Sequence, residues 1–164
     1  MTHLEIERKF LIARPCEELL TSMEGCVRYE ILQTYLSSAP GVDERVRKRV
    51  TEGKTEYFHT LKEHLSPMVR TETESLIGEA EYTALLERAD TAFRPLEKTR
   101  FCIPYAGQTL EIDVYPRLLE EAILEIELPS EETPVILPPF LQVLREATGD
   151  KAYSNRRLAK RETT

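Results

Sequence analysis

Pairs of carboxylates two residues apart are the feature of this sequence with the clearest chemical potential. Three such pairs occur, namely Glu5 and Glu7, Glu111 and Asp113, and Glu125 and Glu127. In an extended strand, residues i and i+2 point to the same face, so the two negative charges of each pair repel each other. Mg²⁺ and Mn²⁺ take oxygen ligands and would relieve that repulsion. The pairs therefore predict bound divalent metal.

Basic residues follow the same spacing on other segments. They are Arg45, Arg47 and Arg49 on one segment, Lys98 and Arg100 on another, and Lys62 and Arg70 on two more, while Lys9 shares the face of Glu5 and Glu7. The guanidinium group offers two parallel donors to phosphate oxygens, and the ammonium group offers a compact charge. Divalent metal, a polyphosphate and surrounding Arg and Lys side chains are the components of phosphoryl transfer.

A solvent-exposed sheet face is the simpler explanation for any single strand of this kind. Such faces, however, usually mix Thr, Ser and Gln with charged residues. Here the polar positions are almost purely ionic over several segments, and they separate by sign. The pattern therefore favours a charged interior over a surface facing bulk water.

The segments that carry these residues alternate with the period of a strand. Eight strands are predicted, over residues 3–12, 28–37, 43–50, 55–62, 69–77, 94–105, 108–115 and 122–128. Pro40-Gly41 and Ala106-Gly107 indicate turns. Helical spacing is confined to residues 16–23, 79–89, 138–148 and 155–161. We expect an α+β protein, an eight-stranded antiparallel barrel lined by the charges and flanked by peripheral helices.

Composition agrees with one compact domain over residues 1–164. The three cysteines match no zinc pattern, no apolar run could span a bilayer, and the N-terminus lacks an apolar leader. We therefore expect free thiols, a cytoplasmic location and no membrane partner. The net charge of −7 argues against nucleic acid as a partner, although a local basic site could still bind a small anion.

The order of these motifs resembles the CYTH domain, or triphosphate tunnel metalloenzyme, family over almost the whole chain. The matching motifs are EIERK at residues 5–9, RVRKR from Arg45, TLK ending at Lys62, RTETE from Arg70 to Glu74, EKTRF around Lys98 and Arg100, EIDV around Asp113, EIEL around Glu125 and Glu127, and KAYSNRRLA with Lys151. The resemblance implies a tunnel fold, cleavage of a triphosphate with two Mg²⁺ or Mn²⁺ ions, and a homodimer as one oligomeric state.

The resemblance also implies a role for each matching residue. The metal ligands would be Glu5, Glu7, Asp113, Glu125 and Glu127. The triphosphate would be bound by Lys9, Arg45, Arg47, Lys62, Arg70, Lys98, Arg100 and Lys151. Catalytic roles would fall to Lys9, Lys62, Arg100 and Glu127. Arg70 and Lys98 would act through charge pairs with Glu72 and Glu74.

The expected reaction is in-line attack of a metal-activated water on the terminal phosphoryl group, since no Ser/His/Asp set supports a covalent intermediate. The general base stays open between a carboxylate such as Glu127 and a lysine with a lowered pKa. Inorganic tripolyphosphate is the favoured substrate, because the chain has no Trp and its aromatic residues, including Phe58, are interpreted as packing. The alternatives are thiamine triphosphate hydrolysis, cyclisation of ATP as in class IV adenylate cyclases, and a non-enzymatic polyphosphate- or nucleotide-binding module.

A few residues near the motifs have simpler interpretations. Arg8 alternates out of phase with Glu7 and Lys9, so we expect it outside the tunnel. His59 is out of phase with Lys62 and is expected outside or at the rim. The basic run of Arg156, Arg157 and Lys160 fits either a solvated helix face or one mouth of the tunnel. Arg49 and Glu111 are expected inside or at the rim.

Overall fold

The structure is a computed structural model and describes residues 2–160. Within that range the strands are β1 (Thr2–Ala13), β2 (Val27–Tyr35), β3 (Val42–Thr51), β4 (Lys54–His64), β5 (Val69–Ile77), β6 (Leu96–Tyr105), β7 (Gln108–Val114), β8 (Glu121–Glu127) and β9 (Val143–Glu146). The helices are α1 (Glu17–Ser22), α2 (Glu79–Leu85) and α3 (Asn155–Ala159), with 3₁₀ turns η1 (Leu86–Arg88) and η2 (Lys151–Tyr153). No helix in the described residues is long and apolar enough to span a membrane.

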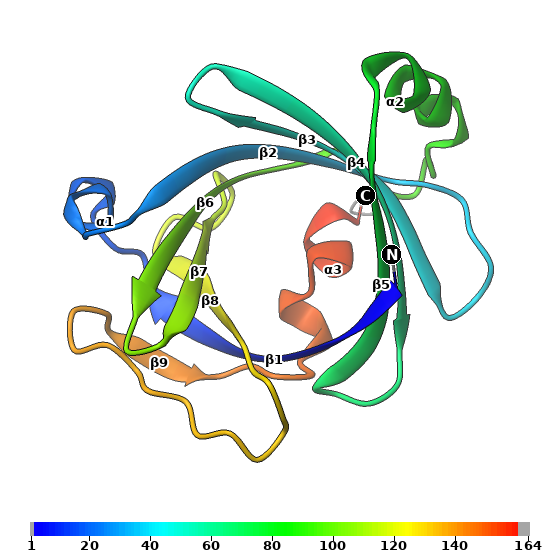
Figure 1. Cartoon of the computed structure of the whole chain (residues 1–164). Helices are drawn as coiled ribbons and strands as arrows, with labels where there is room; N and C mark the ends of the chain where they lie inside the picture. Colours follow the sequence, from blue (N-terminus) through cyan, green and yellow to red (C-terminus); the bar gives the residue numbers. More distant parts are fainter. Residues whose placement is uncertain (1, 161–164) are drawn as a thin grey trace.

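The first eight strands close into an antiparallel barrel, as the alternation predicts (Figure 1). The order around the barrel is β5-β4-β3-β2-β6-β7-β8-β1, and β1 then pairs with β5. Strand β1 completes the ring because its first half pairs with β5 while its second half pairs with β8. The hairpins β3–β4 and β6–β7 turn at Glu52-Gly53 and Ala106-Gly107, where both residues of each turn have positive φ, as tight hairpins require.

The largest apolar cluster lies outside the barrel, and a smaller one with Tyr35, Leu96 and Ile123 lies inside it against α3. The outward faces of β1, β6, β7 and β8 carry a buried cluster that includes Phe10, Phe101, Leu124 and Ile126. Leu20 of α1 packs into the same cluster. Because hydrophobic burial is achieved on the outer surface, the inner surface is free to hold charged side chains.

The segment 138–148 is not the predicted helix. It contains β9, which pairs with Phe10–Ile12 of β1 on the edge that β5 leaves open. Arg8 secures this strand through two hydrogen bonds to the Glu146 carboxylate, at 2.9 and 2.7 Å. The apolar spacing of the segment also suits a helix. The free edge of β1, however, offers backbone hydrogen-bond partners, and pairing with them outweighs the local helix propensity.

The other three predicted helices are found. Residues 16–23 contain α1, residues 79–89 contain α2 followed by η1, and residues 155–161 contain α3. Residue 161 lies outside the described part of the chain.

Candidate active site

Neighbouring strands place their charged positions side by side on the inner face of the barrel. Directly opposed residues of an antiparallel pair share a face, so the register decides which charges meet. The opposed inner pairs include Glu7 with Glu127, Lys9 with Glu125, Glu111 with Glu125, Arg100 with Asp113, Glu5 with Arg70, and Lys62 with Glu72. The alternating charged residues of the sequence thus meet across neighbouring strands on the inner face.

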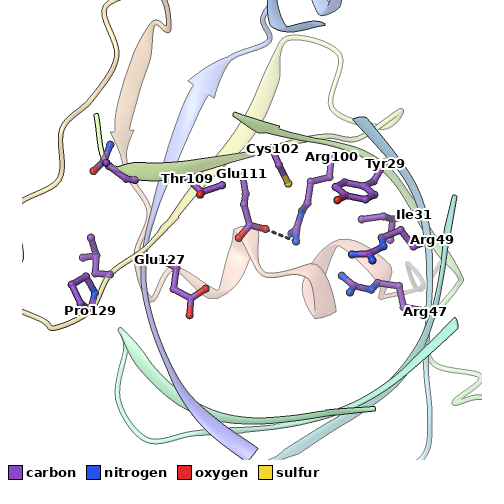
Figure 2. A pocket seen from close by; sticks show the side chains of 13 residues that line it. Tyr29, Ile31, Arg47, Arg49, Arg100, Cys102, Thr109, Glu111, Glu127 and Pro129 are labelled. Carbon is purple, nitrogen blue, oxygen red and sulfur yellow. Dashed lines mark ion pairs between the residues drawn. The ribbon is translucent and has the colours of Figure 1, made fainter. Parts of the chain in front are cut away.

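Opposite walls of the tunnel carry opposite charge. Strand β3, with Arg45, Arg47 and Arg49, stands four strands away from β8 in either direction around the ring, so it faces Glu125 and Glu127 across the bore. Figure 2 shows Arg47 and Arg49 on one side of a cavity and Glu127 on the other. This cavity has a volume of about 590 Å³ and is also lined by Arg100 and Glu111. Arg49 and Glu111 therefore belong to the lining.

Eight Lys and Arg side chains of the described residues gather at the other mouth. Its cavity, of about 890 Å³, is lined by residues that include Lys9, Arg45, Lys62, Arg70, Lys151, Arg156, Arg157 and Lys160. Helix α3 lies within the outline of the ring in Figure 1. Arg156 holds it there by an ion pair to Asp43 of 2.8 Å and by stacking 4.4 Å from the centre of the Phe93 ring. The C-terminal basic run thus lies at a tunnel mouth.

The carboxylates of β1 interact with basic residues of β4 and β5. Arg70 contacts both Glu5 and Glu7, and the Lys62 ammonium lies 3.3 Å from Glu5. Burial opposes ionisation of Glu5, but the charges of Lys62 and Arg70 outweigh it and hold the pKa of Glu5 well below its usual range. Burial and the nearby Glu125 charge raise the pKa of Glu7 to about 8.

A second cluster surrounds Asp113, which is fully buried. Its carboxylate accepts hydrogen bonds from Arg100 Nε at 2.7 Å and from Lys98 Nζ at 2.9 Å. Burial raises the pKa of an acid, but the Arg100 and Lys98 charges outweigh it and lower the pKa of Asp113. Burial lowers the pKa of Lys98 to about 7, although Asp113 acts in the opposite direction.

The partners of Arg70 and Lys98 differ from those expected. Lys98 pairs with Asp113 and Arg70 with Glu5 and Glu7, whereas Glu72 lies 3.0 Å from Lys62 and Glu74 lies 3.5 Å from Arg47. The reason is strand position. Lys98 is on β6, across the barrel from the β5 strand that carries both glutamates, while the register sets Arg70 against β1.

Comparison with known families matches the CYTH domain over residues 3–152. The chain belongs to the CYTH domain family. Among solved structures it is similar to the inorganic triphosphatase NE1496, with 30% identity, coverage of 98% of this chain and 97% of the other, and a TM-score of 0.62. No curated protein matches the sequence.

More distant solved structures share the fold. A putative adenylate cyclase from Bacillus halodurans is 21% identical, with 80% and 83% of the two chains covered and a TM-score of 0.59. The putative adenylyl cyclase HpAC1 from Hippeastrum, described as having a dominant triphosphatase activity, is 19% identical, with 77% and 80% covered and a TM-score of 0.52. At these identities the similarity establishes the barrel alone.

The acidic wall of this CYTH domain has the donor chemistry of a hard-cation site. Glu5, Glu7, Glu125 and Glu127, on the adjacent strands β1 and β8, could supply oxygen ligands. Burial and neighbouring negative charges raise the pKa of Glu7 and of Glu127. A divalent cation would relieve each of these costs, although no three possible ligands in residues 2–160 already converge as a metal-binding group.

Asp113 fits metal binding less well than the other acidic residues. Both of its oxygens already accept hydrogen bonds, Oδ1 from Arg100 and Oδ2 from Arg100 and Lys98. The side chain is therefore placed to orient these two basic groups.

Two outward residues lie where the alternation predicts. Arg8 points away from the bore and bonds to Glu146 of β9. His59 also points outward, and its Nε2 lies 2.6 Å from Glu44.

Three further lining residues are uncharged, so the alternation of charged residues in the sequence does not identify them. Phe58, interpreted from the sequence as a packing residue, lies on the inner face, with the Arg47 and Arg49 guanidinium groups 5.0 and 4.6 Å from its ring centre. Tyr29 lies 4.6 Å below the Arg49 guanidinium. Gln33 is opposed to Arg47 and shares its face. Phe58 is four residues before Lys62 on β4, so the two share a face. Gln33 is likewise four residues after Tyr29 on β2 and shares its face.

Proposed function

We propose that this CYTH protein hydrolyses inorganic tripolyphosphate to pyrophosphate and phosphate with two Mg²⁺ or Mn²⁺ ions. The supporting observation is the opposition of an arginine strand and a glutamate strand across one bore. A polyanion alone would need only the basic wall, whereas a metal–polyphosphate complex matches both walls. The similarity to an inorganic triphosphatase over nearly the whole of both chains supports the same activity.

The acidic wall would bind the metal, and the basic wall would bind the triphosphate. Glu5, Glu7, Glu125 and Glu127 would hold metal, with Asp113 orienting Arg100 and Lys98 beside it. The triphosphate would be bound by Lys9, Arg45, Arg47, Lys62, Arg70 and Arg100, with Lys151 at the basic mouth. When bound, the metal supplies charge neutralisation at the phosphates and acidifies a coordinated water.

The protein's own groups would then manage the proton and the developing charge. The candidates for the general base are Glu127, which lines the cavity and whose pKa is raised by burial, and Lys98, whose pKa is lowered to about 7 by burial. The Lys98 Nζ is fixed by Asp113, whose charge would stabilise the ammonium if Lys98 accepted the proton. Arg100, also bonded to Asp113, is held ready to stabilise charge on the phosphoryl oxygens.

The deciding experiment measures phosphate release from tripolyphosphate, ATP and thiamine triphosphate with Mg²⁺ and with Mn²⁺. We expect the highest kcat/KM with tripolyphosphate. Glu7→Gln should reduce kcat/KM by about 100-fold or more, since a ligand of the metal is lost while the shape is kept. Glu63→Gln, at an exposed position of β4, is the matched control and should be fully active. Absence of turnover with every substrate, or full activity of Glu7→Gln, would contradict the proposal.

An organic triphosphate is the second candidate, and the lining of the cavity in Figure 2 favours it in one respect. Tyr29, Ile31, Leu128 and Pro129 give that mouth an aromatic and apolar portion that could contact a base or a thiazolium ring. The Tyr29 ring is already stacked with Arg49, which is why tripolyphosphate is preferred. Cyclic AMP and pyrophosphate appearing together from ATP would identify the cyclase activity instead, and binding without turnover would identify a binding module.

A further inference from the structure

Gln33 is a buried polar residue whose side chain has no partner. Its exposed fraction is 0%, and neither Oε1 nor Nε2 forms a hydrogen bond with any residue in the range 2–160. Buried amides are almost always hydrogen-bonded, because a desolvated donor or acceptor is costly when left unpaired. An amide in this state has both its donor and its acceptor available to a group other than the described residues.

Its position would place such a group in the tunnel. Gln33 is opposed to Arg47 on β3 and to Leu96 on β6. Two residues earlier, Ile31 lines the cavity of 590 Å³, and two residues later, Tyr35 lines the cavity of 890 Å³. Since alternate residues of β2 share a face, Gln33 lies on the inner wall between the two cavities.

The surroundings of Gln33 indicate the chemistry of that group. Its neighbours on β3 are Arg45 and Arg47, whose Nε atoms are likewise buried and without a partner among the described residues. These groups and the Gln33 Nε2 are all donors, so they call for a ligand rich in acceptor oxygens. Strand β1, with Glu5 and Glu7, stands opposite β2 across the ring and would bring metal to the other side of such a ligand.

We propose that Gln33 is a substrate-binding residue whose Nε2 donates a hydrogen bond to a phosphate oxygen in the middle of the tunnel. This inference rests on the proposed function, because the ligand that it names is the triphosphate chain. A neutral amide adds a donor without adding a further charge to the arginine strand. It also fits beside Arg47, where a third guanidinium would be repelled.

The test uses Gln33→Met, which keeps the length and removes both hydrogen-bonding atoms, and Gln33→Glu, which keeps an acceptor and adds negative charge. Thr34→Val is the matched control, since Thr34 is opposed to Val46 on the outer face of the same strand. Calorimetry measures the affinity for tripolyphosphate in the presence of a metal chelator. Steady-state kinetics with Mg²⁺ give kcat and KM separately, and thermal unfolding gives Tm.

We expect Gln33→Met to weaken tripolyphosphate binding by about 10-fold and to raise KM in step, because a hydrogen bond to a charged acceptor is lost. Its Tm should stay unchanged or rise, because an unpaired amide is removed from the interior. Gln33→Glu should bind still more weakly through repulsion of the phosphates while remaining folded beside Arg45 and Arg47. Thr34→Val should bind and turn over as the wild type does.

Three results would overturn the inference and separate it from the proposed function. Unchanged affinity and KM in Gln33→Met together with a lower Tm would make Gln33 a structural residue. Wild-type affinity in Gln33→Glu would exclude a donor to phosphate. In both cases a wild type that cleaves tripolyphosphate leaves the proposed function standing. A wild type that neither binds nor cleaves tripolyphosphate would overturn both.

Discussion

At the scale of single residues, adjacent side chains of β1 serve opposite surfaces. Arg8 points outward and bonds to Glu146, while Lys9 points inward, with its Nζ 3.7 Å from Glu125 and 3.5 Å from the Tyr153 carbonyl oxygen. The two cations are one residue apart and similar in charge. Their separation into structural and candidate functional groups follows from the alternation of strand side chains alone.

This pair yields a matched comparison. We expect Lys9→Ala to reduce kcat/KM for tripolyphosphate by at least about 10-fold, because a cation facing the polyanion is lost. Arg8→Ala should leave kcat/KM unchanged and lower the free energy of unfolding by about 1 kcal/mol, because it breaks a partly exposed bidentate pair. Steady-state kinetics and urea unfolding measure the two effects. An inactive but folded Arg8→Ala protein would show that the assignment of Arg8 to the outer face of β1 is wrong.

At the scale of elements, the barrel wall is tied to its surrounding helices by polar contacts as well as by apolar packing. Glu44 on the outer face of β3 accepts hydrogen bonds from Arg88 of η1, with the Nη2–Oε1 distance 2.6 Å, and lies 2.6 Å from His59 Nε2 of β4. Burial would raise the pKa of Glu44, but the hydrogen bonds from Arg88 and His59 outweigh it and lower that pKa. The contact therefore connects η1 to the sheet most strongly when Glu44 is ionised.

The sign of the pH dependence follows from this lowered pKa. Below the usual value of 4.5, the unfolded chain binds a proton at Glu44 more readily than the folded chain does, so stability is lost as the pH falls. Glu44→Gln should lower the free energy of unfolding at pH 7 by about 1–3 kcal/mol, and the difference from the wild type should shrink in acid. Urea unfolding at pH 7 and below pH 4 tests this, with Glu63→Gln as the exposed control. A difference that is constant with pH would contradict it.

At the scale of the whole molecule, stability and ligand binding are located on different surfaces of one barrel. The apolar clusters around Phe10 and Val46 lie on the outer faces of the strands, while the charged groups and a smaller apolar cluster around Tyr35 line the bore. A chain built in this way can remain folded without its ligand, since the apolar burial does not depend on the tunnel being filled.

Removal of metal should therefore separate activity from folding. A chelator is expected to abolish turnover of tripolyphosphate while leaving Tm nearly unchanged. Metal and tripolyphosphate together, at about 100 times the dissociation constant, should raise Tm by about 5–10 °C through binding to the folded state alone. Differential scanning fluorimetry with and without chelator measures both effects. Unfolding by the chelator alone would indicate a structural metal instead.

The sequence by itself determined the faces of the strands, the order of the elements and the family resemblance. Alternation is a local property, since backbone geometry sends residues i and i+2 to the same side whatever the rest of the chain does. For that reason Glu5, Lys9 and Arg47 could be assigned to the lining, and Arg8 to the outside, without a structure. The eight barrel strands and three of the four helices followed from the same local periods.

Only the tertiary structure decided which groups meet. Ring closure sets β3 against β8, and register gives Lys98 to Asp113 rather than to a glutamate of β5. Residues 143–146 form a strand because they pair with the open edge of β1, and α3 lies at one mouth of the barrel. Gln33 and Phe58 carry no charge to mark them, so their place in the lining was recognised from strand pairing rather than from the charge pattern. These outcomes depend on contacts between residues far apart in the chain, which no local period encodes.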